Sequence, residues 1–237
     1  MEHQFQRFEA LIGEEKLAIL KSKKVAVFGL GGVGGNVCDA LARSGVSHFL
    51  LVDNDKVNIT NINRQLIANM NTIGKDKVDV MEEHLKSINP DIVIEKKKMF
   101  YLPENAEEIN LSEYDYVIDA IDTVSAKIEL ICRCFSSKTP IISALGCGNK
   151  INPTMLEVTD ISKTSYDPLA KVMRRELRNR GINHLKVIYS KENPIEKVIE
   201  IKDDKKRDVP GSTPFVPPVA GIIIASVVVK DLIEFNR

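Results

Sequence analysis

The sequence predicts an α/β protein with a Rossmann-like, doubly wound and mostly parallel sheet that carries helices on both faces. Short β-branched apolar segments alternate with amphipathic ones, the first apolar segment ends in a glycine-rich turn, and acidic residues follow several of the apolar segments. Strands that alternate with helices need crossover connections, and these give parallel sheets covered on both faces. We expect residues 1–237 to form a single domain.

Strands and helices are expected to alternate along the chain. The segment 24–28 is apolar and β-branched and ends in glycines, which is typical of a buried parallel strand. Further strands are expected at 48–52, 92–94, 116–118 and 140–143. Helices are expected where apolar residues recur at helical spacing, at 34–43, 75–88, 125–135, 168–180 and 219–235. A weaker strand prediction covers 198–201, inside a charged loop insertion at 192–210.

Composition and charge exclude several classes of protein. The 33 Lys and Arg residues balance 33 Asp and Glu residues, so no global field attracts nucleic acid or lipid, and a polyanion site must be local. The apolar run 216–229 contains Pro217 and Pro218 and is shorter than the roughly 20 residues of a spanning helix, so we expect no membrane insertion. Four cysteines and no signal peptide indicate a reduced, cytoplasmic protein.

The turn at 29–34 reads G-x-G-x-x-G between a predicted strand and a predicted helix. Its glycines are Gly29, Gly31, Gly32 and Gly34. Glycines let the backbone approach a phosphate, and the helix N-terminus presents unpaired N–H groups to the anion. Asp53 ends the next predicted strand and is placed to accept hydrogen bonds from a ribose. The pattern predicts a nucleotide site, but NAD, FAD, SAM and ATP all fit it.

Polar residues beyond Asp53 favour a triphosphate. They are Asp55, Asn61, Asn63, Arg64, Gln65 and Lys77. Negative charge spreads over several oxygens as pyrophosphate leaves, and Arg64 and Lys77 are suited to neutralise it. A hydride-transfer enzyme has no evident need for this cluster.

Two more carboxylates, Asp119 and Asp122, follow the fourth predicted strand. Because ligands bind at the carboxyl ends of strands in open parallel sheets, we expect both to converge there with Asp53. A carboxylate beside a polyanion suits Mg²⁺, a hard cation that prefers oxygen ligands. The alternative is that Asp119 or Asp122 caps the helix that begins near Val124.

The order and spacing of these motifs resemble the ATP site of the ubiquitin-activating-enzyme-like adenylyltransferases, the ThiF/MoeB/HesA group. The likeness is carried by 29–34, 51–55, 60–65, 74–77 and 119–122. Within the group, the segments 115–122, 152–154, 163–170 and 210–212 resemble one branch, the tRNA threonylcarbamoyladenosine dehydratases, over nearly the full length.

The resemblance implies an ATP-dependent enzyme with Mg²⁺. It would adenylate the carboxylate of the threonylcarbamoyl group on a tRNA adenosine, release pyrophosphate, and close a ring as AMP leaves. The glycine turn and Asp53 would hold the nucleotide. Asn61, Asn63, Arg64, Gln65 and Lys77 would line its phosphates. Asp122 would hold the metal ion, and Arg7 would reach the phosphates of a partner subunit in a homodimer, unless Arg7 is a plain surface residue. Accessory sulfur-transfer or electron-transfer proteins are possible further partners, and the sequence does not identify them.

The cysteines predict neither a zinc site nor a reactive thiol. Many members of the group hold zinc through two C-x-x-C pairs, whereas this chain has one C-x-C pair, Cys132 and Cys134, in a predicted helix. Cys38 and Cys132 occupy apolar helix positions. Cys147 follows the fifth predicted strand and is the single candidate for a nucleophile, although we favour a small buried side chain.

A basic helix predicts where a polyanion would bind. The predicted helix 168–180 has an apolar stripe and, on another face, Lys171, Arg174, Arg175 and Arg178. Backbone phosphates of tRNA are the expected target, and an ordinary solvated face is the alternative. The cluster Lys205, Lys206 and Arg207 would extend this surface.

Other functions remain compatible with part of the pattern. An adenylyltransferase acting on the C-terminus of a ubiquitin-like sulfur carrier would share the ATP site. A nicotinamide-dependent oxidoreductase would account for the glycines and Asp53 but leaves Arg64, Lys77 and Asp122 unexplained. A non-catalytic nucleotide-binding protein is the remaining alternative.

Overall fold

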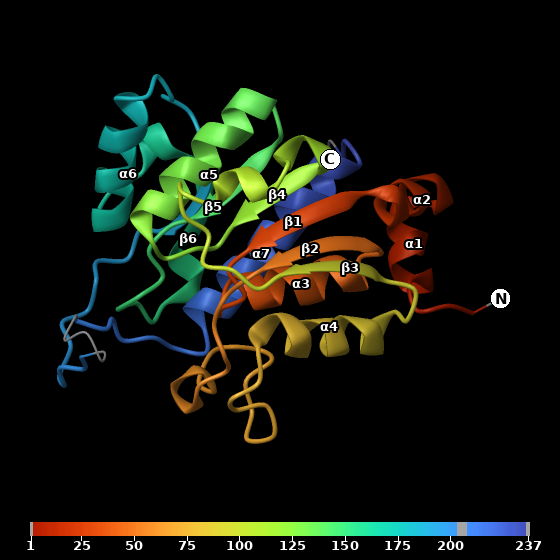
Figure 1. The fold of residues 1–237 in the computed structure, drawn as a ribbon, viewed down its shortest axis with the longest axis horizontal. Helices are drawn as coiled ribbons and strands as arrows, with labels where there is room; N and C mark the ends of the chain where they lie inside the picture. The colour runs from red at the N-terminus through yellow and green to blue at the C-terminus, as the bar shows by residue number, and fades with distance from the viewer. Residues whose placement is uncertain (1, 203–207, 236–237) are drawn as a thin grey trace.

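The computed structural model describes residues 2–202 and 208–235, and its centre is a sheet (Figure 1). Within these residues the sheet has seven strands in the order β3-β2-β1-β4-β5-β7-β6. All neighbouring strands are parallel except β6 and β7, which pair antiparallel. The predicted α/β class with a mostly parallel sheet is confirmed.

The strand bounds show where sequence patterns were informative. The strands are β1 (Lys24–Phe28), β2 (His48–Val52), β3 (Val93–Lys97), β4 (Tyr116–Asp119), β5 (Ile141–Ala144), β6 (Leu156–Asp160) and β7 (Lys186–Ser190). The first five coincide with predicted strands, whereas β6 and β7 were not predicted. The strand predicted at 198–201 is wrong. Val198 is 99% exposed and Ile199 is 74% exposed, and the contact from Val209 N–H to Ile201 O at 2.9 Å does not extend into a strand.

The helices follow the predicted alternation. They are α1 (Gln6–Ile12), α2 (Glu14–Ser22), α3 (Gly34–Arg43), α4 (Lys77–Ile88), α5 (Val124–Ser137), α6 (Pro168–Arg178) and α7 (Val216–Leu232). Helices α1 and α2 were not predicted. Helix α7 begins earlier than position 219 because Pro217 and Pro218 lie in its first turn. Proline is tolerated there, since the first N–H groups of a helix have no intrahelical partner.

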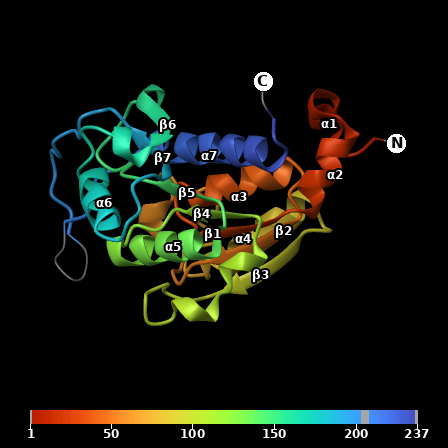
Figure 2. The same cartoon turned by 90° about the horizontal axis from the view of Figure 1, so that it is seen from above.

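Helices cover both faces of the sheet (Figure 2). Helices α3, α4 and α7 pack on one face, and α5 and α6 on the other. Side chains of β1 alternate between the two cores, with Val25 and Val27 on the first face and Ala26 and Phe28 on the second. Helix α7 lies against α3 at Gly221, where any Cβ would collide with the carbonyl oxygen of Val33.

The strand order positions a binding site. After β1 the chain passes to β2 on one side of the sheet, whereas β4 is the neighbour of β1 on the other side. In such folds the carboxyl ends of these two strands open a crevice at the switch point. Helices α1 and α2 lie at the opposite edge, where β1 begins (Figure 1). In the described residues no helix is long and apolar enough to cross a membrane.

Candidate nucleotide-binding site

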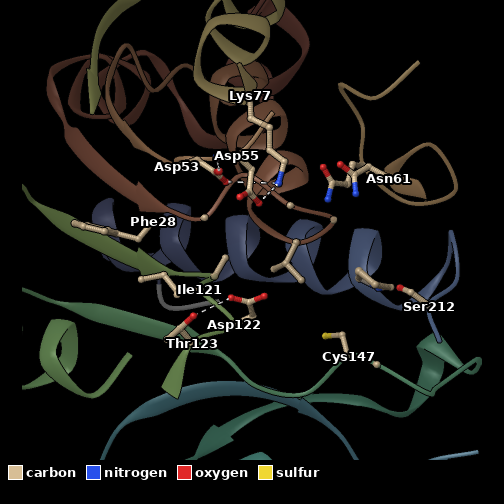
Figure 3. Close-up of a pocket in the computed structure, with 18 of the residues that line it drawn as sticks. Phe28, Asp53, Asp55, Asn61, Lys77, Ile121, Asp122, Thr123, Cys147 and Ser212 are labelled. Carbon is tan, nitrogen blue, oxygen red and sulfur yellow. Dashed lines mark hydrogen bonds and ion pairs between the residues drawn. The ribbon is translucent and has the colours of Figure 1, made fainter. Parts of the chain in front are cut away.

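A cavity of about 920 Å³ opens at the carboxyl ends of β1, β2 and β4 (Figure 3). Its volume is within the range of small-molecule sites, ~300–1,000 Å³. Ten of the residues proposed from the sequence line it: Gly29, Gly31, Gly32, Asp53, Asp55, Asn61, Arg64, Gln65, Lys77 and Asp122. Gly34, Asn63, Asp119 and Arg7 are not among its lining residues. The motifs therefore converge, but not every residue in them faces the cavity.

The glycines of the turn have two different functions. Gly29 has a φ of +87°, and a Cβ there would lie 2.6 Å from the carbonyl oxygen of Ala120. A Cβ on Gly34 would collide with the carbonyl oxygen of Gly29, so these two glycines permit the turn itself. At Gly31 the nearest atom to an added Cβ is Gln65 Nε2 at 3.8 Å. Gly31 thus leaves the floor of the cavity open for a ligand.

Asp53 and Lys77 form the buried charged centre of the site. The Asp53 carboxylate accepts hydrogen bonds from the N–H groups of Leu30 (2.6 Å) and Asp55 (2.8 Å). Lys77 Nζ lies 2.8 Å from the Asp55 carboxylate and 4.0 Å from that of Asp53 (Figure 3). Burial raises the pKa of Asp53, and the positive charge of Lys77 opposes that shift. Leu30 belongs to the glycine turn, so one carboxylate links the turn to the end of β2.

Arg64 is held in place before any ligand arrives. It follows the short 3₁₀ helix Ile59–Asn61, and its Nη1 donates to Thr60 O and to Asn63 Oδ1, both at 2.9 Å. Burial lowers the pKa of its guanidinium. Asn63 was expected to line the phosphates, but instead it donates from Nδ2 to Ser212 O at 3.1 Å and accepts from Arg64. Asn63 therefore positions Arg64, and it is not among the residues that line the cavity.

Two amides beside Arg64 point to a ligand. Gln65 is 7% exposed, and its Oε1 has no hydrogen-bond partner among the described residues. A buried polar atom without a partner costs about 1–3 kcal/mol, and in a cavity wall it indicates a group that binds there. Asn61 accepts from Asn58 N–H at 2.9 Å through Oδ1, which leaves its NH₂ group for another acceptor.

The two acidic residues after β4 have different surroundings. Asp122 is exposed, lines the cavity and accepts a hydrogen bond from Thr123 Oγ1 at 3.3 Å (Figure 3). Asp119 is completely buried and paired with Lys127 at 2.9 Å, so the expectation that it converges on the ligand is wrong. Its carboxylate also accepts from Ser143 Oγ at 2.5 Å. Asp119 is the last residue of β4, and its side chain points to the face of the sheet that α5 covers, whereas Asp122 lies in the loop beyond the strand.

Cys147 lines the cavity as a protonated thiol. Burial raises its pKa to about 11, and its Sγ donates to Leu145 O at 3.6 Å. A nucleophilic cysteine needs a lowered pKa, so this side chain is suited to packing. Burial also raises the pKa of Cys38. Among the described residues no group of three or more His, Cys, Asp or Glu side chains is arranged to hold a metal ion.

Two walls of the cavity were not predicted as parts of the site. Residues 99–101 follow β3 and form one wall together with Phe28. Since they come directly after a parallel strand, the rule that ligands bind at carboxyl ends would have located them. Residues 208–212 precede α7 and form the other wall. Asn149 holds this segment by accepting from Gly211 N–H at 2.6 Å and donating to Gly211 O at 2.8 Å.

The proposed tRNA-binding and partner-binding residues lie outside the cavity. Lys171, Arg175 and Arg178 are exposed on α6, whereas Arg174 is half-buried and its Nη1 donates to Thr164 O at 2.9 Å. One nitrogen of the Arg174 guanidinium is thus engaged within the chain, and the basic face of α6 stays a prediction. Arg7 is exposed on α1. The cluster 205–207 lies outside the described residues.

Known proteins are similar to this chain in sequence and fold. The model of the ThiF family matches residues 3–236. The chain belongs to the ThiF family. A relative in Bacillus subtilis (strain 168), tRNA threonylcarbamoyladenosine dehydratase, is 46% identical over 248 aligned positions that cover 99% of this ThiF-family chain and 96% of the relative.

Solved structures agree with this ThiF-family match. The E. coli tRNA N6-threonylcarbamoyladenosine dehydratase in complex with AMP superposes with a TM-score of 0.88 at 32% identity, covering 98% of this chain and 94% of that one. The same enzyme in complex with ATP gives a TM-score of 0.87 at 31% identity, with the same coverage. The similarity therefore includes structures whose ligands are adenine nucleotides.

Proposed function

We propose that this chain is an ATP-dependent dehydratase that adenylates the carboxylate of threonylcarbamoyladenosine in tRNA and then cyclises the modification. The observation that carries the proposal is the convergence of Arg64, Lys77 and Asp122 on one cavity at the switch point. The likeness to a dehydratase over 99% of the chain supports the choice of substrate. A nicotinamide enzyme would leave the two cations of this cavity without a function.

The proposed reaction has two steps, adenylation and cyclisation. A carboxylate oxygen of the substrate attacks the α-phosphorus of ATP, and the bond to the β-phosphate oxygen breaks as pyrophosphate leaves. An internal nucleophile of the modification, which loses a proton, then attacks the activated carbonyl and AMP leaves. The net result is the loss of water from the substrate and the cleavage of ATP to AMP and pyrophosphate.

The residues of the cavity match the needs of the first step. The open backbone at Gly31 and the N-terminus of α3 suit the phosphates, and the buried Asp53 carboxylate suits the ribose hydroxyls. Arg64 and Lys77 suit the charge that develops on the leaving pyrophosphate. Arg64 is held by its own loop, so little reorganisation is needed when that charge appears.

The residues present also fit Mg²⁺. Asp122 offers an exposed carboxylate to the cavity, and phosphate oxygens and water would complete the coordination, as is usual for this ion. Bound Mg²⁺ would supply neutralisation of phosphate charge. Asp122 is the residue that we expect to hold it.

A homodimer in the cytoplasm is also proposed. Apolar side chains are exposed along the loop after β2: Ile59, Ile62, Leu66, Met70 and Ile73. Apolar patches of this kind mark protein interfaces, and most soluble oligomers are symmetric copies of one chain. Arg7 would then act at the cavity of the partner. Four free cysteines and a tRNA substrate favour a reducing compartment.

Exchange of labelled pyrophosphate into ATP tests the proposed function. We expect exchange only when tRNA carrying threonylcarbamoyladenosine is present, because the substrate carboxylate must form the adenylate. Arg64→Ala should abolish exchange and keep the fold, whereas Arg43→Ala, which removes an exposed arginine paired with Asp39 on α3, should retain it. Equal exchange with the C-terminal peptide of a sulfur carrier would replace the dehydratase assignment by an adenylyltransferase that acts on such a carrier.

A further inference from the structure

An exposed aromatic side chain stands at the turn before α6. Tyr166 is 70% exposed and has a φ of +58°, in the left-handed region. A bulky residue rarely adopts this strained conformation, which persists when the surrounding structure enforces it. The chain thus holds a large ring in water at an energetic cost.

A first anchor fixes the chain before Tyr166. Thr164 is buried, and its Oγ1 donates to Ile161 O at 2.7 Å. Arg174 reaches across from α6 and donates through Nη1 to Thr164 O at 2.9 Å and to Thr164 Oγ1. Arg174 of α6 therefore helps to hold this turn in place.

A second anchor fixes the residue that follows. Asp167 is 3% exposed, and its Oδ1 accepts from Ala170 N–H at 2.9 Å as the N-cap of α6. Its Oδ2 lies 3.4 Å from Nζ of the buried Lys150, which also donates to Ser190 O at 3.1 Å. Both neighbours of the segment 165–166 are thus fixed by buried polar contacts, which hold the backbone at Tyr166 in place.

The turn lies next to the nucleotide cavity. A Cβ on Gly146 would be 3.0 Å from the Asp167 carboxylate, so this carboxylate packs on the loop that continues into Cys147 and Gly148 of the cavity wall. Lys163 and Lys171 are exposed on either side of the turn, while Asp167 is already paired with Lys150. The exposed charged residues that flank Tyr166 in the sequence are therefore basic.

We propose that Tyr166 is a stacking platform for an unpaired base of the RNA substrate, beside the adenosine that enters the cavity. Single-stranded loops are recognised by stacking their bases on aromatic side chains, with basic residues nearby for the phosphates. A backbone fixed in advance loses little freedom on binding, which accounts for the strained turn. This inference rests on the proposed function, since it requires an RNA substrate.

Affinity for tRNA carrying threonylcarbamoyladenosine tests the platform. Tyr166→Ala should weaken binding by about tenfold or more, as is usual for the loss of one stacked base, and Tyr166→Phe should bind like wild type. The salt dependence of binding should keep its slope, because stacking releases no counterions. Phe135→Ala is the matched control: Phe135 is 44% exposed near the end of α5, at the opposite edge of the sheet, and its removal should leave affinity unchanged.

A glycine variant separates recognition from folding. Tyr166→Gly relieves the strained φ, so it should unfold at the same or higher temperature than wild type and still lose tRNA affinity. Wild-type affinity in Tyr166→Ala and Tyr166→Gly would overturn the platform and leave the proposed function standing. Equal losses of tRNA affinity in Tyr166→Phe and Tyr166→Ala would also overturn the platform, because the hydroxyl group and not the ring would then make the contact. The absence of both tRNA binding and pyrophosphate exchange in the wild type would instead refute the proposed function.

Discussion

The ammonium group of Lys127 lies 2.9 Å from the Asp119 carboxylate, and neither side chain has any exposed surface. Lys127 Nζ also donates to Ile121 O at 3.1 Å and to Ala144 O at 2.8 Å. Ile121 N–H donates to Asp119 at 3.2 Å, so both sides of the peptide chain before Asp122 are held. This buried pair connects the end of β4 to the end of β5 and fixes the loop that presents Asp122 to the cavity.

Removal of Lys127 should destabilise the protein strongly. Lys127→Met leaves the Asp119 charge buried without compensation, and breaking a buried pair in this way costs about 3–5 kcal/mol of unfolding free energy. Urea denaturation measures the change. Lys86→Met, which breaks an exposed pair with Glu82 on α4, should lose less than about 1 kcal/mol.

A double variant shows whether the uncompensated charge is the cause. Lys127→Met combined with Asp119→Asn removes both charges, so it should be more stable than Lys127→Met alone. If the two losses instead add, the energetic interpretation of this pair is wrong.

Asp119 shows where sequence patterns stop being informative. The glycine turn and Asp53 were located correctly because their placement depends on a local motif and the end of a strand. The sequence places Asp119 and Asp122 equally well at the carboxyl edge. Which of them faces a ligand depends on Lys127 and Ser143, which come from the following helix and the next strand.

Contacts between segments that are distant in the sequence were also not predicted. The cavity wall at 208–212 is held by Asn149, and no local pattern predicts that contact. The edge strand β6 has only half-buried residues, so it shows no apolar run to identify it. Arg174 belongs by spacing to the basic face of α6, but its contact with Thr164 becomes apparent only in three dimensions.

The two functions of the glycine turn predict two different phenotypes. Gly34→Ala places a Cβ against Gly29 O, so the turn must distort and the melting temperature should fall by several degrees. Gly31→Ala meets no close neighbour, so the fold should stay intact while the methyl group occupies phosphate space and ATP affinity falls about tenfold or more. Calorimetric melting and ATP titration measure the two effects. A fully stable Gly34→Ala protein would contradict the packing role.

The pH dependence of adenosine binding should follow the ionisation of Asp53. Burial raises the pKa of Asp53, so ribose binding should weaken as the pH falls through that raised value. Lys77→Met removes the charge that lowers the pKa, and the acidic midpoint should move to higher pH. Asp55→Asn removes a like charge that raises it, and the midpoint should move to lower pH. Adenosine is the suitable probe because it carries no phosphates for Lys77 to contact, and shifts of the same sign in both variants would refute this assignment.

Arg178, which is exposed, and Arg174, which is half-buried, should respond differently to charge reversal. Arg178→Glu changes an exposed side chain, so it should weaken tRNA binding most at low salt and make the slope of log affinity against log salt shallower by about 1, with little change in stability. Arg174→Glu removes the donor to Thr164, so it should lower the melting temperature and, through the displaced turn, reduce tRNA affinity at every salt concentration. Binding curves from 50 to 200 mM salt, roughly the range over which phosphate contacts lose most of their strength, distinguish the two effects. Unchanged tRNA affinity in Arg178→Glu would show that this face of α6 is only solvated surface.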